Sequence, residues 1–266
     1  MQKRGDFLNK NKSGQVTIYI IIAVIIVVAV VLFLLLRTGL VPNPLGGETK
    51  NPNEYLSSCL EDPIANAVAK LGPQGGNINP TLYKNFKFSD EDKPYKVSYL
   101  CYNVNNYLPC VNQQPMLVSH VEEEIKKEIQ GSAQDCFSGL EKSYRSAGYQ
   151  TEILENGETE IKMDENKIVV NFNKKIRITK TGESRILTDL KGEVQNKILK
   201  LVEIAVRIVN AKTASCRFDI ADYSMAHPQE NIDFFQAEDG TEIYTTRIEG
   251  NNQFFRFAIR GKGSGC

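Results

Sequence analysis

Residues 16–36 form an uninterrupted apolar run, VTIYIIIAVIIVVAVVLFLLL, near the start of a chain of 266 residues. The run holds no charged residue and no proline, and its polar side-chain atoms are the hydroxyls of Thr17 and Tyr19. At about 1.5 Å of rise per helical residue it spans roughly 31 Å, which matches the hydrocarbon core of a bilayer. The run therefore predicts a single transmembrane helix surrounded by membrane lipid.

The charges on either side of this run predict its orientation. Four basic residues precede it, Lys3, Arg4, Lys10 and Lys12, and Arg37 directly follows it. Because a positively charged flank stays in the cytoplasm, we expect residues 1–15 to be a cytoplasmic tail or leader and the bulk of the chain to be extracellular. The first alternative is a cleaved secretory signal peptide. Its apolar region would be shorter, about 7 to 15 residues, and a small-residue cleavage site would follow it.

The segment before the run carries a processing motif. Residues 10–18, KNKSGQVTI, resemble the class III signal sequence of archaeal type IV pilin-like proteins. The resemblance implies that a prepilin-type peptidase cuts between Gly14 and Gln15 and that the retained helix packs with like subunits in a filament. Two positions depart from the family pattern: Ser13 replaces the usual basic residue, and Tyr19 stands where many pilins carry a glutamate. The alternative is a plain signal-anchor with an intact N-terminus.

The charge balance argues against a nucleic-acid partner. Lys+Arg and Asp+Glu each number 32, for a formal net charge of +0. Residues 1–37 hold five basic residues and one acidic residue, so residues 38–266 carry a net charge of −4. Nucleic-acid binding needs a basic surface, and the expected outer part of this chain is mildly acidic.

The six cysteines predict disulfide bonds. They are Cys59, Cys101, Cys110, Cys136, Cys216 and Cys266, and all lie on the expected outer side, where disulfides persist. Six cysteines allow 15 pairings. Cys101 and Cys110 bracket YNVNNYLP, which favours a closed loop between them, and Cys266 is a candidate partner for Cys216. The spacings and the presence of only two histidines argue against a zinc site.

A second, looser resemblance covers roughly residues 14–140. The segments Ser-Cys-Leu-Glu at 58–61, Leu-Gly at 71–72, Gln-Gly-Gly at 74–76 and Asp-Cys-Phe at 135–137 resemble a recurrent family of archaeal membrane-anchored proteins. This resemblance implies that Cys59 and Cys136 are partners. It implies nothing about an activity.

The outer chain has a mixed periodicity. Residues 37–53 are rich in Gly, Pro and Asn and predict a linker. Helical spacing predicts helices over 54–71, 115–129, 133–147 and 191–212, and alternation predicts a strand over 95–102. Short alternating segments predict an antiparallel meander, with strands at 150–154, 158–163, 167–172, 175–180 and 184–188.

The end of the chain predicts a second, three-stranded meander within residues 232–260. Its aromatic residues are expected in the core: Phe234, Tyr244, Phe254, Phe255 and Phe257. Should several of them be exposed, they would mark an interface.

Several polar residues are candidates for chemistry, and we interpret each as structural. His120 flanks the apolar stripe of its helix, and the glutamates at 122–124 are typical of a solvated helix face. Residues 164–166 lack the spacing of a calcium loop and favour a turn. No nucleophile motif accompanies Asp222 and His227. We therefore expect no catalytic residue, no cofactor and no metal site.

Together these features predict an α+β protein: a single N-terminal transmembrane helix, then an extracytoplasmic domain over residues 54–266 with antiparallel meanders and packed helices. Residues 54–148 are expected to be mainly helical, and 149–266 a sheet with one long helix. The expected function is that of a pilin-like surface protein that acts through contacts, in adhesion or surface assembly. The alternatives are an accessory subunit of a membrane complex and a surface ligand-binding or enzymatic domain on a plain signal-anchor.

Overall fold

The computed structural model describes residues 21–27, 51–88, 91–215 and 217–261. The chain divides into two compact units, Met1–Glu48 and Thr49–Cys266. In the first unit residues 21–27 are helical. The rest of the expected transmembrane helix, the leader and most of the linker lie outside the described residues. None of the helices in the described part is both long enough and apolar enough to cross a membrane.

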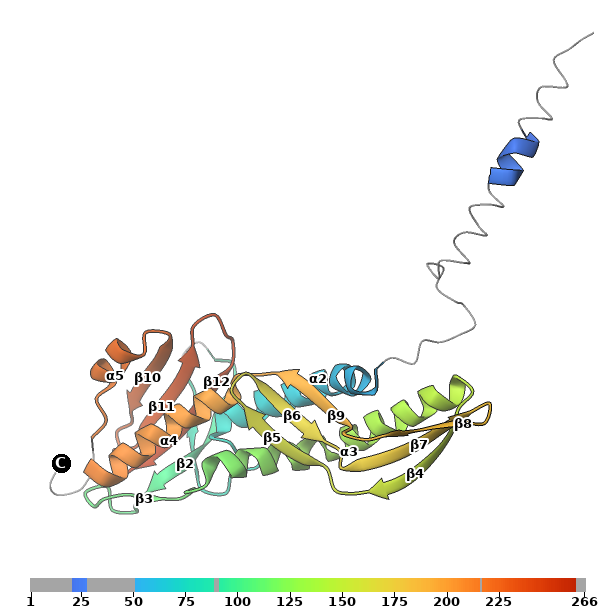
Figure 1. The fold of residues 1–266 in the computed structure, drawn as a ribbon. Helices are drawn as coiled ribbons and strands as arrows, with labels where there is room; N and C mark the ends of the chain where they lie inside the picture. Colours follow the sequence, from blue (N-terminus) through green and yellow to red (C-terminus); the bar gives the residue numbers. More distant parts are fainter. Residues whose placement is uncertain (1–20, 28–50, 89–90, 216, 262–266) are drawn as a thin grey trace, which may run out of the picture. The chain divides into compact units, whose positions relative to one another are not determined.

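The second unit is a mixed α+β fold, as the sequence predicts, and its largest sheet has six strands (Figure 1). The strand order is β1-β2-β12-β11-β10, with β3 paired to β2. The strands are β1 Tyr83–Phe86, β2 Tyr95–Tyr102, β3 Val111–Asn112, β10 Glu230–Gln236, β11 Glu242–Ile248 and β12 Phe254–Arg260. Pairing is antiparallel except between β12 and β2. The predicted C-terminal meander is confirmed, whereas its parallel pairing with β2 was not predicted.

Helix α4, Ile198–Ser215, covers one face of this sheet (Figure 1). The prediction that a helix begins at residue 191 was wrong, because Lys191–Gln195 forms strand β9. Val194 fits either period, but in the structure it pairs with Ile168 of the neighbouring strand. Gly192 allows the strand to lie against α2, since a Cβ there would lie 2.5 Å from Leu60. Asn196 then begins the helix by accepting a hydrogen bond from Ile198 N at 2.9 Å.

The remaining strands form two three-stranded antiparallel sheets instead of one meander. Their strands are β4 Gln150–Asn156, β5 Glu160–Asp164, β6 Lys167–Asn171, β7 Lys174–Lys180 and β8 Glu183–Leu187, together with β9. One sheet has the order β4-β7-β8 and the other β5-β6-β9. The prediction of sequential pairing was wrong because the β5–β6 hairpin leaves β4 and pairs with β9, while β4 pairs with β7. Good hairpin turns fix neighbours locally but do not fix which sheet a hairpin joins.

Two long helices, α2 Pro52–Leu71 and α3 Leu117–Ser146, pack against each other and against these sheets (Figure 1). The sequence predicts two helices in place of α3, with a break at Gln-Gly-Ser 130–132. The helix is continuous because its buried stripe passes through this segment, from Ile129 to Ala133 and Phe137. The core contacts of this stripe outweigh the cost of one interior glycine, about 1 kcal/mol. The short helices η1, Gly72–Gln74, and α5, Ile220–Ala226, were not predicted.

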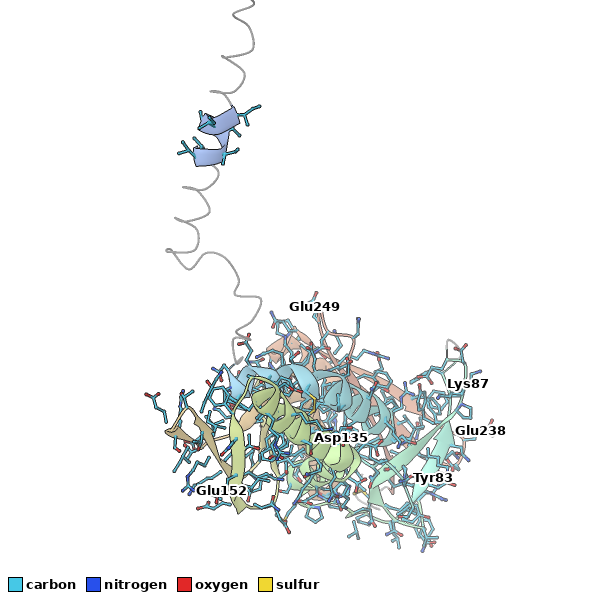
Figure 2. The ribbon with its side chains drawn as sticks, turned by 90° about the vertical axis from the view of Figure 1, so that its right-hand side faces the viewer. Tyr83, Lys87, Asp135, Glu152, Glu238 and Glu249 are labelled. Carbon is cyan, nitrogen blue, oxygen red and sulfur yellow. A yellow bond between two sulfur atoms is a disulfide. The ribbon has the colours of Figure 1, made fainter. Side chains whose placement is uncertain are left out.

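A smaller apolar cluster lies on the other face of the six-stranded sheet. It consists of Val97, Tyr99, Ile243 and Ala258, with Phe86, Tyr95 and Tyr102 packed against it. Arg256 is fully buried beside it, pairs with Glu91 at 2.7 Å and donates to Thr245 Oγ1 at 3.0 Å. Lys84 pairs with Asp239 at 2.7 Å, so β1 lies beside the β10–β11 turn. Figure 2 shows Tyr83, Lys87 and Glu238 together on that side of the unit.

The predicted core aromatics fall into two groups. Tyr244, Phe255 and Phe257 are buried, as expected. Phe254 is half-buried, and Phe234 is 46% exposed on the edge strand β10. The expectation that Phe234 belongs to the core was therefore wrong, because β10 has a partner strand on one side only.

Candidate functional site

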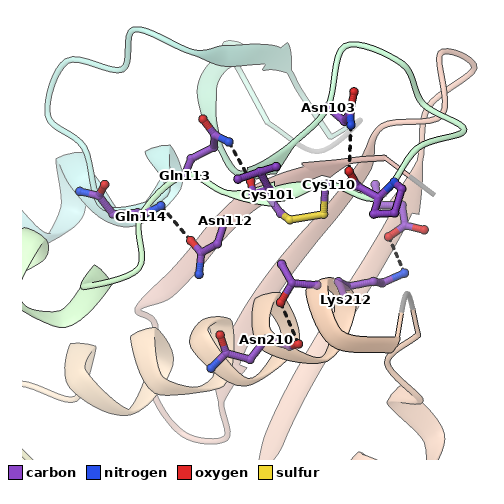
Figure 3. The surroundings of a disulfide bond; sticks show 12 residues. Cys101, Asn103, Cys110, Asn112, Gln113, Gln114, Asn210 and Lys212 are labelled. Carbon is purple, nitrogen blue, oxygen red and sulfur yellow. Dashed lines mark hydrogen bonds and ion pairs between the residues drawn. A yellow bond between two sulfur atoms is a disulfide. The ribbon is translucent and has the colours of Figure 1, made fainter. Parts of the chain in front are cut away.

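The loop between β2 and β3 is closed at its base by a disulfide bond. Cys101 ends the buried part of β2, and its sulfur bonds that of Cys110 with a Cα–Cα distance of 5.3 Å (Figure 3). Next to the disulfide, antiparallel strand pairing of Cys101 with Asn112 and of Tyr102 with Val111 also holds the two ends of the loop together. The pairing fits the loop that the cysteine spacing predicts. We call residues 103–109 the closed loop.

Asparagine side chains hold the closed loop in one conformation. Asn103 Nδ2 donates to Pro109 O at 2.8 Å, and Asn103 Oδ1 accepts from Asn105 N at 3.0 Å. Leu108 N donates to Asn105 O at 3.0 Å. Asparagine favours turns because its side chain replaces backbone hydrogen-bond partners. Hydrogen bonds within the closed loop, made by its own asparagines, therefore account for its conformation.

The closed loop also rests on the end of the six-stranded sheet. Asn103 N donates to Arg260 O at 2.7 Å, which joins it to the last residue of β12. Gly261 has a φ of +135°, and a Cβ there would lie 2.7 Å from Leu108 O. At Gly240, in the β10–β11 turn, a Cβ would lie 3.0 Å from Asn106 Nδ2. The loop is thus held from both sides by backbone that approaches closely.

Apolar side chains project from this rigid support. Val104 is 66% exposed and Tyr107 is 64% exposed, and Leu108, Val111 and Met116 are exposed as well. Apolar side chains held on a cross-linked loop lose little conformational freedom when a partner covers them. The closed loop and its flanks can therefore bind another surface through apolar contact.

A buried ion pair supports the sheet beneath the loop. Lys212, near the end of α4, pairs with Glu242 of β11 at 2.7 Å, and both side chains are almost completely buried (Figure 3). Glu242 also accepts from the Tyr244 hydroxyl at 3.0 Å. Burial, reinforced by the Glu242 carboxylate, raises the pKa of Tyr244 far above its usual value. Tyr244 therefore stays a neutral donor, and the arrangement is structural.

The other predicted site residues lie elsewhere. Gly14, Gln15, Cys216 and Cys266 lie outside the described residues. Cys59 of α2 and Cys136 of α3 form a disulfide with a Cα–Cα distance of 5.8 Å, which fits the pairing that the second resemblance implies.

The acidic run at 122–124 is not a fully solvated face, contrary to expectation. Glu122 is buried and accepts from Met163 N at 2.9 Å and from Lys162 at 3.3 Å. Glu124 accepts from Ile78 N at 2.9 Å, and its pKa is lowered because this bond and Lys127 outweigh the opposing effect of burial. Both glutamates cap backbone groups of neighbouring segments. Only Glu123 has the exposed position that the sequence predicts.

His120 also has a structural partner. Its Nε2 lies 2.9 Å from Asn77 Oδ1, next to the Gly75-Gly76 turn, where both glycines have positive φ. Burial lowers the pKa of His120, although Glu124 opposes the shift. A neutral imidazole is therefore favoured, and it holds the turn that follows η1.

The remaining candidates show no catalytic geometry. Asp222 lies in the first turn of α5, and the His227 ring packs against the Tyr223 ring in a tilted arrangement with centroids 4.5 Å apart. Within the described ranges no hydrogen bond joins Asp222 to His227. Asp164 accepts from Glu165 N at 2.9 Å in the β5–β6 turn. Across the part of the chain that the structure describes, no group of three metal-ligating side chains converges.

Sequence comparisons bring no further assignment: the chain matches no protein-family model and is similar to no curated protein.

Proposed function

We propose that the protein is a membrane-anchored, pilin-like cell-surface protein that acts through protein contacts, in adhesion or surface assembly, and not through catalysis. The observation that carries the proposal is the closed loop, which holds exposed Val104 and Tyr107 on a disulfide-bonded base. The apolar run 16–36 supplies the anchor. The N-terminus is cytoplasmic, and residues 54–266 are extracellular.

The two disulfides support an extracellular location for the folded unit. Disulfides persist in oxidising compartments and are rare in the cytosol. Both join cysteines that the orientation rule assigns to the outer side, at positions 59, 101, 110 and 136. The charge asymmetry around the apolar run and the cysteine chemistry thus support the same topology independently.

The position of the closed loop suits a contact role. Helix α2 begins beside β9, where Asn53 Oδ1 accepts from Lys191 N at 3.1 Å. Its 20 residues carry the chain about 30 Å to Gly72, which lies against Phe254 at the start of β12. The closed loop lies at the other end of β12 (Figure 1). The chain therefore enters the folded unit far from the loop.

The anchor and processing are tested by the intact mass of the protein extracted from its native membrane, with and without reduction. Loss of residues 1–14 supports pilin-type processing and a filament. A full-length N-terminus overturns processing and leaves a signal-anchored surface protein. Reduction should add about four protons for the two described disulfides and about six if Cys216 and Cys266 also pair. No mass change would overturn the extracellular assignment.

The contact role is tested by cross-linking in native membranes. We expect wild-type protein to form cross-linked species and the Val104→Ser/Tyr107→Ser variant to form fewer, because exposed apolar area is lost. Met225→Ser is the matched control, since Met225 is an exposed apolar residue on α5, away from the loop. Equal cross-linking of the two variants would contradict the role of the loop. A heterologous partner in the cross-linked species would favour the accessory-subunit alternative over self-assembly.

A further inference from the structure

A groove of about 800 Å³ lies between α3 and the connection from β4 to β5. One wall is formed by α3 residues at helical spacing, Lys126, Lys127, Gln130 and Gln134. The other wall is the segment 156–159, Asn-Gly-Glu-Thr, and Lys174 of β7 completes the lining. The groove has the volume of a small-molecule site. Lysines, amides and a hydroxyl form much of its surface, together with Glu158, whose carboxylate pairs with Lys126 across the groove at 3.6 Å.

Lys174 is the unusual residue of this groove. Lys174 is only 7% exposed, and its Nζ lies 4.3 Å from the centroid of the Phe137 ring. Nζ donates one hydrogen bond, to Gln134 Oε1 at 3.2 Å. An ammonium group has three donors. No carboxylate of the described residues lies within ion-pair distance of it.

Every other buried charged side chain in the described part of the unit has an opposite charge beside it. Four ion pairs show this: Glu122 with Lys162 at 3.3 Å, Glu230 with Lys200 at 3.2 Å, Glu242 with Lys212 at 2.7 Å, and Arg256 with Glu91 at 2.7 Å. A buried charge without a partner is costly. Burial lowers the pKa of Lys174, and the charge of Glu141 opposes this only in part. An anion in the groove would supply the missing partner.

Gly131 is a second feature of the groove that packing does not explain. It lies within α3 and lines the groove, yet a Cβ there would meet no atom within 4 Å. Glycine inside a helix is destabilising relative to alanine, so packing gives no reason for it. Gly157, on the opposite wall, differs because a Cβ there would lie 2.5 Å from Asn173 O. The fold requires Gly157, whereas Gly131 keeps the helix surface open for close approach.

We propose that this groove binds an acidic saccharide, with a carboxylate or sulfate group on the Lys174 ammonium and hydroxyl groups on the neighbouring amides. The anionic group is favoured because Lys174 has an amide and an aromatic ring beside it but no counter-charge within ion-pair distance among the described residues. The saccharide is favoured because Gln130, Gln134, Asn156 and Thr159 offer both donors and acceptors, which hydroxyl groups need. The groove is separate from the closed loop, so this inference does not rest on the proposed contact function.

Calorimetric titration of the full chain in nanodiscs tests the proposal. The probes are a galacturonic acid trimer, a sulfated chondroitin disaccharide and neutral maltotriose. We expect at least one acidic probe to bind, and maltotriose to bind at least tenfold more weakly. Preference for the uronate or for the sulfate identifies which anionic group the groove takes. Failure of both acidic probes to bind at millimolar concentration would overturn the proposal, whatever the outcome of the cross-linking experiment.

Three variants locate the binding. Lys174→Gln should weaken binding of the acidic probe at least tenfold. Gly131→Leu should also weaken this binding, because the larger side chain obstructs the groove without a change in charge. Lys175→Gln is the matched control, because it removes the same charge from the next residue, whose ammonium pairs with Glu155 at 2.7 Å. Circular dichroism confirms that each variant is folded. Equal weakening by Lys174→Gln and Lys175→Gln would overturn the site, since it would indicate attraction by net charge alone.

Discussion

Two buried lysines distinguish the two functional regions of the unit. Lys212 lies beneath the closed loop, near an aromatic ring and paired with Glu242 at 2.7 Å. Lys174 lies in the groove, also over an aromatic ring, but an amide is its hydrogen-bond partner. The side chains are of one type and similarly buried, so the difference lies in the counter-charge.

The difference separates a structural charge from one available to a ligand. The Lys212–Glu242 pair is complete within the protein and fastens α4 to β11. Its contribution is to hold the sheet end on which the closed loop rests. The Lys174 ammonium makes one hydrogen bond within the described residues, and Lys174 lines a polar groove. The first region therefore offers apolar contact on a rigid base, and the second offers a charged, hydrogen-bonding site.

The two disulfides should differ most in their effect on stability. Cys59–Cys136 closes a sequence separation of 77 residues and Cys101–Cys110 one of 9. In the chain-entropy account the longer closure contributes about 4.5 kcal/mol and the shorter about 2.5 kcal/mol. The double variant Cys59→Ser/Cys136→Ser should therefore lose more free energy of unfolding than Cys101→Ser/Cys110→Ser. Urea unfolding without reductant measures both.

The same pair of variants separates scaffold from contact. Cys101→Ser/Cys110→Ser should reduce cross-linking in native membranes, because the closed loop loses its base, while the other double variant should retain it when folded. A larger stability loss from the short-range disulfide would contradict the entropic argument.

Replacement of each buried lysine by methionine tests the comparison directly. Lys212→Met leaves Glu242 buried without its partner, and we expect a loss of about 3 kcal/mol in the free energy of unfolding. Lys174→Met removes an unpaired ammonium and keeps the packing on Phe137, so we expect no loss or a small gain. Thermal and urea unfolding of the two variants, side by side, measure the difference. Equal losses would show that Lys174 has a structural partner after all.

The sequence predicted what depends on local pattern. The α+β class, the strand 95–102, the helix near 54–71 and the C-terminal meander all follow from period and turn chemistry. The closed loop follows from cysteine spacing and asparagine content. Its exposed residues were not predicted, although Val104 lies between Asn103 and Asn105 and Tyr107 directly follows Asn106, where a loop offers them no core.

The incorrect predictions concern residues whose structure depends on partners far away in the sequence. Residues 191–195 alternate weakly enough to join either a helix or a sheet, and β6 decides the matter. The sequence predicts Glu122 to be a surface residue, but in the structure the β5–β6 hairpin brings Met163 N within hydrogen-bond distance of its carboxylate. The burial of Lys174 could have been predicted from the sequence, because Lys174 shares a strand face with the apolar Ile176 and Ile178. A charged residue at that register position predicts either a strand end or a buried charge.

The two glycines of the groove should respond oppositely to alanine. Gly131→Ala should raise the free energy of unfolding by up to about 1 kcal/mol, because alanine favours the helix and meets no neighbour. Gly157→Ala should lower it, since the new methyl group would press on Asn173 O. Urea unfolding gives both signs. A loss of stability in Gly131→Ala would mean that packing, and not access to the groove, explains the glycine.

The smallest effect concerns the turn beside the closed loop. Burial disfavours the Asp239 carboxylate, but hydrogen bonds from Lys84 and from Thr241 N outweigh it and lower the pKa of Asp239 to about 2. Because the folded pKa lies below the unfolded value of 3.8, this stabilisation is present above about pH 4 and is lost as the pH falls through about 2.

Asp239→Asn should therefore cost about 1 kcal/mol at pH 7, a value that allows for solvent screening of a partly exposed pair. The cost should shrink towards zero near pH 2. Urea unfolding at pH 7, 4, 3 and 2 measures this, with the neighbouring exposed Glu238→Gln as the charge-matched control. A cost that stays constant with pH would assign the role of Asp239 to turn geometry instead of charge.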